Sequence, residues 1–337
     1  MFASLALAPL ALSGFAALTP GDRAAAPRGT LVLQDEPSAL DAATCRSLAS
    51  GDGTHERLWI VLPGASTAVD PLSACPARVT RMDIEEGASR RGDDHDLAAR
   101  AHAAREIVLS RGTYLGWWRF LGRAGATSRV GRALEEAQRK GKVICAQGAA
   151  AAYLAQWTPV EHADILRVSR NPRDAGDPFV VNGFALLTDT LIDTSTRTRG
   201  EIEPLLVALA RGSIVDAIHL DGPVSWIRGE HGDRVVGHGR VIQLALGRAR
   251  TMRGELREAR VTLLGSAPQR GDRSVAAGDG EALTAAEFAA RIDALCDGRA
   301  TTDSLARARL RVTLWIDEAS RRDVRDGIGI DVLRARE

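Results

Sequence analysis

The stretch Lys142-Val-Ile-Cys-Ala-Gln-Gly-Ala-Ala-Ala-Ala-Tyr-Leu154 decides the fold class of this 337-residue chain. Residues 143–145 form a short apolar run, which is typical of a strand buried on both faces. Gly148 follows within a few residues, and glycine permits a sharp turn because it has no side chain to clash. The alanines after the turn are strong helix formers. The stretch therefore predicts a buried strand, a tight turn at Gly148 and a helix that begins directly after it.

The same alternation of strand and helix runs through the first half of the chain. We expect strands at residues 29–34, 57–62, 77–80 (extending to 84), 106–109 and 143–145, and helices at 41–50, 93–104 and within 119–140. Continuous apolar strands that alternate with helices predict an α/β fold, with a mostly parallel sheet covered by helices on both faces. Ligands of such sheets bind beyond the carboxyl ends of the strands. We therefore expect a site where the turns after these strands meet.

The second half of the chain has a different pattern. Short apolar runs lie at residues 184–187, 190–193, 216–227, 234–236, 241–245 and 261–264, and a helical pattern lies at 201–211. Glycine turns separate the runs between residues 216 and 245, which predicts antiparallel hairpins. Residues 270–280 are rich in turn formers and indicate a linker. Beyond it, residues 283–295 predict an amphipathic helix, and residues 305–317 fit either a helix or a strand.

Charge and motif content exclude several classes of function. The chain has 44 basic and 43 acidic residues, a net charge of +1, which argues against a nucleic-acid-binding protein. It contains neither a phosphate-binding loop nor a dinucleotide fingerprint, so we expect no cofactor. Asp93-Asp94-His95-Asp96 is the densest cluster of metal-capable side chains. Adjacent side chains at a helix start point apart and acidic ones favour its dipole, so we expect a helix start and no metal site.

Cysteine usage leaves two interpretations open. Cys45, Cys75, Cys145 and Cys296 are far apart in the sequence and lack the spacing of a metal site. The chain has either one disulfide, between Cys45 and Cys75, or four free thiols.

The N-terminus predicts export. Residues 1–26 contain an uncharged apolar run followed by small residues, which is typical of a signal peptide for the periplasm or the cell exterior. No basic residue precedes the apolar run, so the alternatives are a mispredicted start codon or an apolar N-terminal extension, either of them on a cytoplasmic protein. The remaining sequence has no apolar segment of the roughly 20 residues that a membrane span needs.

The order of the strand-end motifs resembles the cyanophycinase family of serine peptidases over residues 29–272. The motifs that carry the resemblance are Trp59-Ile-Val-Leu-Pro-Gly-Ala-Ser66, Ile107-Val-Leu-Ser-Arg-Gly-Thr-Tyr114, Lys140-Gly-Lys-Val-Ile-Cys-Ala-Gln-Gly-Ala-Ala150, Leu191-Ile-Asp-Thr-Ser195 and Ala217-Ile-His-Leu-Asp-Gly-Pro-Val-Ser225. The resemblance implies the three-layer, flavodoxin-like fold of the class I glutamine amidotransferases, which dipeptidase E shares. It also implies a domain at residues 27–272, a linker and C-terminal extension at 273–337, and a homodimer.

The catalytic groups of that family fall on residues that lack the required chemistry. By position, the serine nucleophile falls on Gly148 and the histidine base on Ser195. Removing either group of a catalytic triad abolishes most of its rate acceleration. The sequence therefore predicts a pseudoenzyme, which binds a peptide, a small molecule or a partner protein.

The expected binding site surrounds the empty turn. The family's substrate-binding Gly-Asp-Gln turn becomes Gly112-Thr113-Tyr114, and its acidic pair becomes Asp221-Gly222. The residues that we expect to line the site are Gly112, Thr113, Tyr114, Gln147, Asp193 and Asp221.

Two other hypotheses remain open. The first is an active hydrolase of the same fold whose nucleophile is Ser66, Ser110 or Cys145 and whose base is His219. A serine or cysteine side chain within about 3.2 Å of a histidine nitrogen would favour it. Against it, an isolated cysteine in a strand is usually buried, and a histidine in an apolar run is more often a hydrogen-bonded core residue. The second is an assembly component that docks through a helix pair within residues 283–317.

Overall fold

The computed structural model of the protein describes most of the chain between residues 29 and 334. The described ranges are 29–48, 54–64, 68–85, 89–123, 126–159, 180–194, 202, 205–206, 209, 214–230, 232–245, 250–252, 255–265, 288–291, 302–307, 310–315 and 328–334. The segments predicted as a signal peptide and as a linker lie outside these ranges.

The first sheet has seven strands in the order β13-β12-β1-β7-β4-β2-β3. Five of them are parallel: β1 (Thr30–Gln34), β7 (Val143–Gln147), β4 (Glu106–Arg111), β2 (Glu56–Leu62) and β3 (Arg78–Asp83). A hairpin of β12 (Val224–Gly229) and β13 (Gly232–Gly237) adds to β1 in the antiparallel direction. The carboxyl ends of the five parallel strands therefore share one edge, which we call the carboxyl edge.

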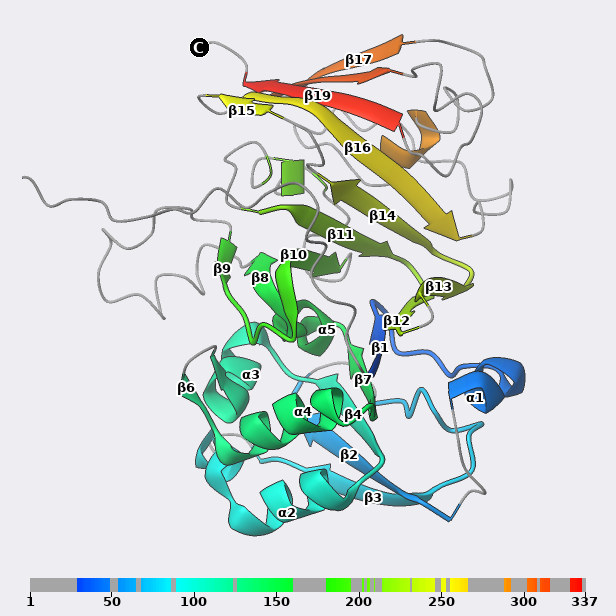
Figure 1. Ribbon diagram of the computed structural model, residues 1–337, viewed down its shortest axis with the longest axis vertical. Helices are drawn as coiled ribbons and strands as arrows, with labels where there is room; N and C mark the ends of the chain where they lie inside the picture. The colour runs from blue at the N-terminus through cyan, green and yellow to red at the C-terminus, as the bar shows by residue number, and fades with distance from the viewer. Residues whose placement is uncertain are drawn as a thin grey trace, which may run out of the picture.

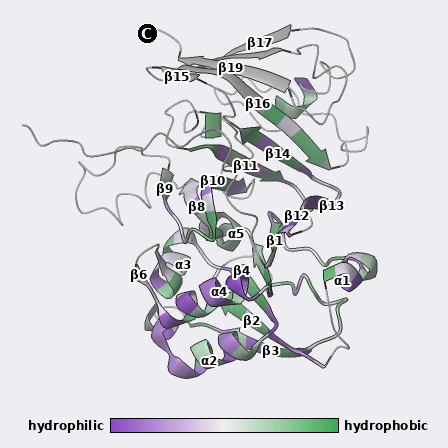
Figure 2. Ribbon diagram, in the orientation of Figure 1, coloured by the Kyte–Doolittle hydropathy of each residue, from purple (hydrophilic) through white to green (hydrophobic). Residues whose placement is uncertain are grey.

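Helices cover both faces of this sheet. Helices α2 (His95–Ala103), α3 (Tyr114–Leu121) and α4 (Arg129–Arg139) pack on one face in the larger apolar core. Helix α1 (Ala42–Leu48) packs on the opposite face, in a smaller cluster that includes Val32 and Cys145. Figure 1 shows α2, α3 and α4 grouped together and α1 set apart from them. In Figure 2, strand β2 is hydrophobic and the visible side of α4 is hydrophilic, as expected for a buried strand beneath a surface helix.

The helix starts follow local capping chemistry. Asp94 Oδ1 accepts hydrogen bonds from the amides of Asp96 and Leu97 at 2.9 and 3.1 Å, so it caps α2 at the helix start that the sequence predicts. Thr113 and Ser128 cap α3 and α4 in the same way. Such side chains satisfy amide groups that have no partner inside the helix. The 3₁₀ helix η1 (Ser89–Asp93) and the short strands β5 (Gly122–Arg123) and β6 (Ala126–Thr127) lie in the connections.

A second sheet lies beyond the first, in the order β17-β18-β19-β16-β14-β11-β10-β8-β9, with β15 beside β16. Its strands are β8 (Ala155–Pro159), β9 (Val180–Asn182), β10 (Leu187–Thr194), β11 (Asp216–Asp221), β14 (Arg240–Ala245), β15 (Arg250–Met252), β16 (Glu255–Gly265), β17 (Thr302–Arg307), β18 (Leu310–Trp315) and β19 (Ile328–Arg334). Strand β10 runs parallel to β8 and β11, and the other pairs are antiparallel. Helix α5 (Ala149–Leu154) connects β7 to β8 and packs against both sheets (Figure 1).

The predicted fold class is confirmed. The protein is an α/β protein with a mostly parallel sheet, helices on both faces of that sheet and antiparallel hairpins in the second half. The predicted strand at residues 143–145 exists as β7, and Gly148 separates it from a helix.

Two local predictions need correction. The single helix expected within residues 119–140 is two helices, because Gly122, at a φ of 79°, ends α3 and a short hairpin precedes α4. Within residues 305–317, β17 and β18 pair with each other, so a docking helix pair there is wrong.

Candidate functional site

The turn after β7 has the backbone of a nucleophile elbow with a glycine at its tip. Gly148 has φ 55° and ψ −122°, a conformation that side-chain-bearing residues adopt rarely and at a cost. Its amide donates to the carbonyl of Gln34 at 2.8 Å, which fixes the tip beside the end of β1. A Cβ built on Gly148 has one atom of the described residues within 4 Å, the carbonyl oxygen of Asp35 at 3.5 Å. Among the described residues, the tip therefore has room for a side chain that the sequence does not supply.

The turn after β4 lies at the same edge of the sheet. Arg111 and Gly112 both have positive φ angles, 64° and 80°. A Cβ on Gly64, which follows β2, would lie 3.0 Å from the amide nitrogen of Gly112, so the two turns are in contact. Thr113 is exposed and caps α3, whereas Tyr114 is buried and donates its hydroxyl to the carbonyl of Asn182 at 2.8 Å. Of these residues, Thr113 offers a side chain to solvent and Tyr114 braces the turn against β9.

A row of hydrogen-bonded polar side chains crosses the sheet beneath this edge, on the face that α1 covers. Its members, which we call the polar row, are Trp59, Ser110, Gln147, Gln34 and Ser225. They come from β2, β4, β7, β1 and β12, one from each adjacent strand. Four of the five are at most 2% exposed and Trp59 is 9% exposed.

Each member of the polar row donates to the next. Trp59 Nε1 donates to Ser110 Oγ at 2.9 Å, and Ser110 Oγ donates to Gln147 Oε1 at 2.7 Å. Gln147 Nε2 then donates to Gln34 Oε1 at 2.9 Å, and Gln34 Nε2 donates to Ser225 Oγ at 2.7 Å. Because buried polar atoms cost free energy when unpaired, a chain of this kind fixes the relative register of five strands. Gln147 directly precedes Gly148, so the polar row also holds the elbow.

Two of the predicted nucleophiles are unavailable for attack. Ser110 is fully buried and its hydroxyl is engaged at both sides in the polar row. Cys145 is a buried free thiol, as the simpler interpretation of an isolated strand cysteine predicts. Burial raises its pKa well above the ordinary thiol value, and the nearby charge of Asp70 acts in the same direction. A thiol that stays protonated is a poor nucleophile.

His219 forms a buried pair with Asp193. The two residues are directly opposite in the register of β11 and β10, and His219 Nδ1 lies 2.8 Å from Asp193 Oδ2 with both side chains fully buried. Burial alone would lower the pKa of His219. The hydrogen bond to Asp193 and the charges of Asp193, Asp221 and Asp35 outweigh it, so the pKa of His219 is raised. His219 is therefore the hydrogen-bonded core histidine that burial statistics favour.

The His219 pair has the acid–histidine half of a triad without the nucleophile. Within the described part of the chain, His219 Nε2 makes no hydrogen bond. The same ranges contain no serine hydroxyl or cysteine thiol hydrogen-bonded to a histidine; the close histidine contacts are to carboxylates. The contact that would favour an active hydrolase is thus missing among the described residues. Ser66 and Ser195 lie outside them.

Acidic residues connect the elbow to the second sheet. Asp35 follows β1, is 1% exposed, and accepts a hydrogen bond from the amide of Gly222 at 3.3 Å. Asp221 ends β11 and is partly exposed. Of the predicted site residues, Gly112, Thr113, Gln147 and Asp221 therefore lie at or beside the carboxyl edge, whereas Asp193 is buried with His219.

Gln34, Trp59 and Ser225 of the polar row, and Asp35 beside the elbow, are not among the site residues that the sequence predicts. The available signal was the polar residue that ends each apolar strand, such as Gln34 after a buried run. That signal identifies residues at the edge but not their hydrogen-bond partners. Gln34 and its partner Ser225, for example, are 191 residues apart in the sequence, so no local pattern connects them.

The described residues show no group of three or more metal-capable side chains close enough to hold an ion. Asp94 is instead a helix cap, and Asp93 accepts from the amide of Arg129 at 3.1 Å. No helix in the described ranges is both long and apolar enough for a membrane crossing.

Comparisons with known proteins found a similarity in backbone fold. No family model matches the sequence, and no curated protein matches it. Among solved structures, a peptidase from an acI-B1 Actinobacterium is similar. The likeness is one of fold alone. The two proteins are 14% identical over 64% of this chain and 90% of that chain, with a TM-score of 0.46. Roles for individual residues therefore come from the geometry of this chain.

Proposed function

We propose that this protein is a catalytically inactive relative of the cyanophycinase-type serine peptidases, which binds a peptide, a small molecule or a partner protein at the carboxyl edge without cleaving it. The observation that carries the proposal is Gly148, which keeps the backbone of a nucleophile elbow but has no side chain. A serine could stand there, because the nearest described atom is 3.5 Å from the Cβ position. Crowding by the described residues is therefore not the reason for the missing nucleophile.

The state of the other candidate groups supports the same conclusion. Ser110 and Cys145 are buried, and each is held in a form that does not attack a carbonyl. His219 is fully buried with Asp193. A general base must reach the proton that it removes, and a base without a neighbouring hydroxyl or thiol has nothing to activate.

A second function is favoured by one specific observation. The Asp193–His219 contact of 2.8 Å is the acid–histidine arrangement that orients a catalytic base. Together with a nucleophile at Ser66, it would make an active hydrolase of the same fold. This alternative requires His219 to become accessible.

Covalent labelling separates the two functions. We expect no stoichiometric modification of the folded protein by a fluorophosphonate or by iodoacetamide, and no turnover of a panel of dipeptides. Site-specific modification of Ser66 that blocks turnover, and that is lost in both Ser66→Ala and His219→Gln, would establish the active hydrolase instead.

Ligand binding is tested separately from catalysis. We expect a dipeptide library, screened by thermal shift and then by calorimetry, to contain ligands whose affinity falls in Asp221→Asn. Asp216→Asn is the matched control, because Asp216 is a partly exposed aspartate at the opposite end of β11. A library in which no compound shifts the melting temperature would remove the small-ligand form of the proposal.

We further propose that the protein is exported after removal of residues 1–26 and forms a homodimer, with a domain at residues 27–272 and an extension at 273–337. The disulfide between Cys45 and Cys75 supports export, because disulfides persist mainly in oxidising compartments. The mass of the chain recovered from the periplasm or medium tests the cleavage, and analytical ultracentrifugation tests the dimer.

A further inference from the structure

Two separate chain segments cover the face of the first sheet opposite α2–α4, and a disulfide joins them. We call residues 40–48, which include α1, and residues 70–75 together the cover. Cys45 in the first segment is bonded to Cys75 in the second, 30 residues later. The amide of Leu40 also donates to the carbonyl of Pro71 at 2.8 Å. The two segments thus hold each other as well as the sheet.

The cover closes an apolar cluster that contains a free thiol. Leu40, Cys45, Leu72 and Cys75 are each at most 4% exposed and pack in one cluster with residues of β1, β2, β4 and β7. Cys145 on β7 belongs to this cluster and is fully buried. Loss of the cover would therefore expose Cys145.

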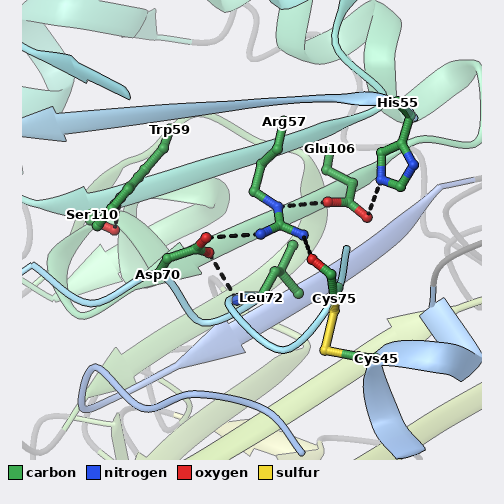
Figure 3. A network of polar contacts seen from close by, with 9 residues as sticks. All are labelled: Cys45, His55, Arg57, Trp59, Asp70, Leu72, Cys75, Glu106 and Ser110. Carbon is green, nitrogen blue, oxygen red and sulfur yellow. Dashed lines mark hydrogen bonds and ion pairs between the residues drawn. A yellow bond between two sulfur atoms is a disulfide. The ribbon is translucent and has the colours of Figure 1, made fainter. Parts of the chain in front are cut away.

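One buried guanidinium attaches the cover to the sheet (Figure 3). Arg57 on β2 is 1% exposed. Its Nη1 pairs with Asp70 Oδ2 at 2.8 Å, and its Nη2 donates to the carbonyl of Cys75 at 2.8 Å. Its Nε pairs with Glu106 Oε2 at 2.7 Å, and Glu106 also contacts His55 Nε2 at 2.9 Å. Arg57 therefore has two partners in the cover and one in the sheet.

This division of partners makes the cover separable. Removing the partner of a buried charge is strongly destabilising when the charge stays buried without compensation. If residues 70–75 move away, however, Arg57 keeps Glu106, and water reaches the side of the guanidinium that Asp70 and Cys75 occupied. Opening the cover therefore leaves no charged side chain of the sheet buried without a partner.

Each segment of the cover is weak by itself. Helix α1 has seven residues, fewer than an isolated helix needs to persist in water. Residues 71–75 form turns and insert one large side chain, Leu72, into the core. The cross-link between the segments is therefore the contact that makes them one unit, because it limits the conformations open to both.

We propose that the Cys45–Cys75 disulfide is a redox latch on this cover: the cover is closed when the bond is formed and opens locally when both cysteines are thiols. Closing is thiol–disulfide exchange with a disulfide oxidant. One thiolate attacks the oxidant and displaces a thiolate, and the second attacks the mixed disulfide, so that one S–S bond forms and the oxidant leaves as two thiols. A dithiol reverses both steps and becomes a cyclic disulfide.

The experiment measures alkylation of Cys145 at about pH 8 by iodoacetamide, read by peptide mass so that each cysteine is followed separately. The proteins are the oxidised wild type and Cys45→Ser/Cys75→Ser. We expect Cys145 to react at least about tenfold faster in the double variant, from the loss of cross-linking in a loop of this size. Asp70→Asn, which keeps the disulfide and weakens the Arg57 contact, should give an intermediate rate.

Hydrogen exchange distinguishes a disulfide that closes only the cover from one that stabilises the whole first sheet. In the double variant, we expect faster exchange at residues 40–48 and 70–75 with unchanged protection in β4 and β7. Equal Cys145 rates in the two proteins would overturn the proposal, as would protection lost together throughout the first sheet.

If the double variant does not fold, reduced wild-type protein provides the same test. The wild type is incubated with dithiothreitol in native buffer, and exchange and Cys145 alkylation are followed as before. A disulfide that resists the dithiol while the protein stays folded, or whose reduction unfolds the whole sheet, contradicts a latch. Reoxidation with oxidised glutathione should restore the slow alkylation rate.

Discussion

His219 Nδ1 lies 2.8 Å from Asp193 Oδ2, across adjacent parallel strands and with both side chains fully buried. The hydrogen bond to Asp193 and the nearby carboxylates raise the pKa of His219 despite its burial. Stability must therefore depend on pH through His219.

We expect His219 to stabilise the fold at low pH and to contribute less as the pH rises. Its pKa is raised above the ordinary value of 6.5, so the folded protein binds the proton more tightly than the unfolded chain does. The stabilisation is fully present below the unfolded pKa and is lost as the pH rises through the folded pKa. In urea denaturation, the wild type should exceed His219→Gln in free energy of unfolding by more at about pH 5.5 than at about pH 9.

His95→Gln is the control for this titration, because His95 is 81% exposed. It should change the free energy of unfolding little at either pH. A His219→Gln difference that is the same at both pH values would contradict a raised pKa.

Gly148→Ser should not restore peptidase activity. The new hydroxyl would have room among the described residues, but His219, the candidate base, is fully buried against Asp193. A side chain at this backbone conformation should cost about 1–3 kcal/mol of stability. The measurements are dipeptide hydrolysis and fluorophosphonate labelling, with Gly148→Ala as the variant that bears the same backbone cost without a hydroxyl. Turnover by the serine variant alone would show that a functional base is present.

Ser110→Ala should destabilise the protein by about 1–3 kcal/mol, because it leaves Trp59 Nε1 and Gln147 Oε1 buried without a partner. Urea denaturation measures the loss. In a cycle with Trp59→Phe, the double variant should lose less than the sum of the single variants. Ser73→Ala, at an exposed serine, is the control. Strict additivity would mean that the two side chains are not coupled.

Arg57→Met should destabilise the fold by about 3–5 kcal/mol, because it leaves Glu106 buried without its guanidinium partner. Arg57→Met/Glu106→Leu should recover a large part of this loss, since it removes both charges. Thermal and urea unfolding at neutral pH measure both effects. A double variant that is less stable than Arg57→Met would contradict this prediction. It would show that Glu106 stabilises the fold even when Arg57 is absent.

The first half of the fold follows from local signals in the sequence. Continuous apolar runs predict β1, β2, β4 and β7, and the acidic residues at 93–96 predict the start of α2. The empty elbow could also be predicted, because a strand, a glycine and an alanine-rich helix are adjacent in the chain. The boundary between α3 and α4 could not, since it depends on the short β5–β6 hairpin and on Gly122 rather than on apolar periodicity.

The side-chain contacts of the site could not be predicted from the sequence, for a different reason. The polar row unites five strands, and the Asp193–His219 pair depends on strand register. The sequence placed His219 among the candidate bases but gave no acid partner for it. It left the Cys45–Cys75 disulfide as one of two alternatives, because spacing alone does not bring two thiols together.

Strand β1 is paired on one side by β12, whose Ser225 is 191 residues from Gln34 along the chain. Contacts between residues so distant in sequence slow folding, because a long loop must close before they form. During synthesis, one edge of the apolar strand β1 would stay unpaired until the ribosome has made the β12–β13 hairpin, which ends at Gly237. Unpaired edges invite pairing with other chains. A shortened product that stops before β12 should therefore aggregate, and a chain translocated before folding would form this edge only after crossing the membrane.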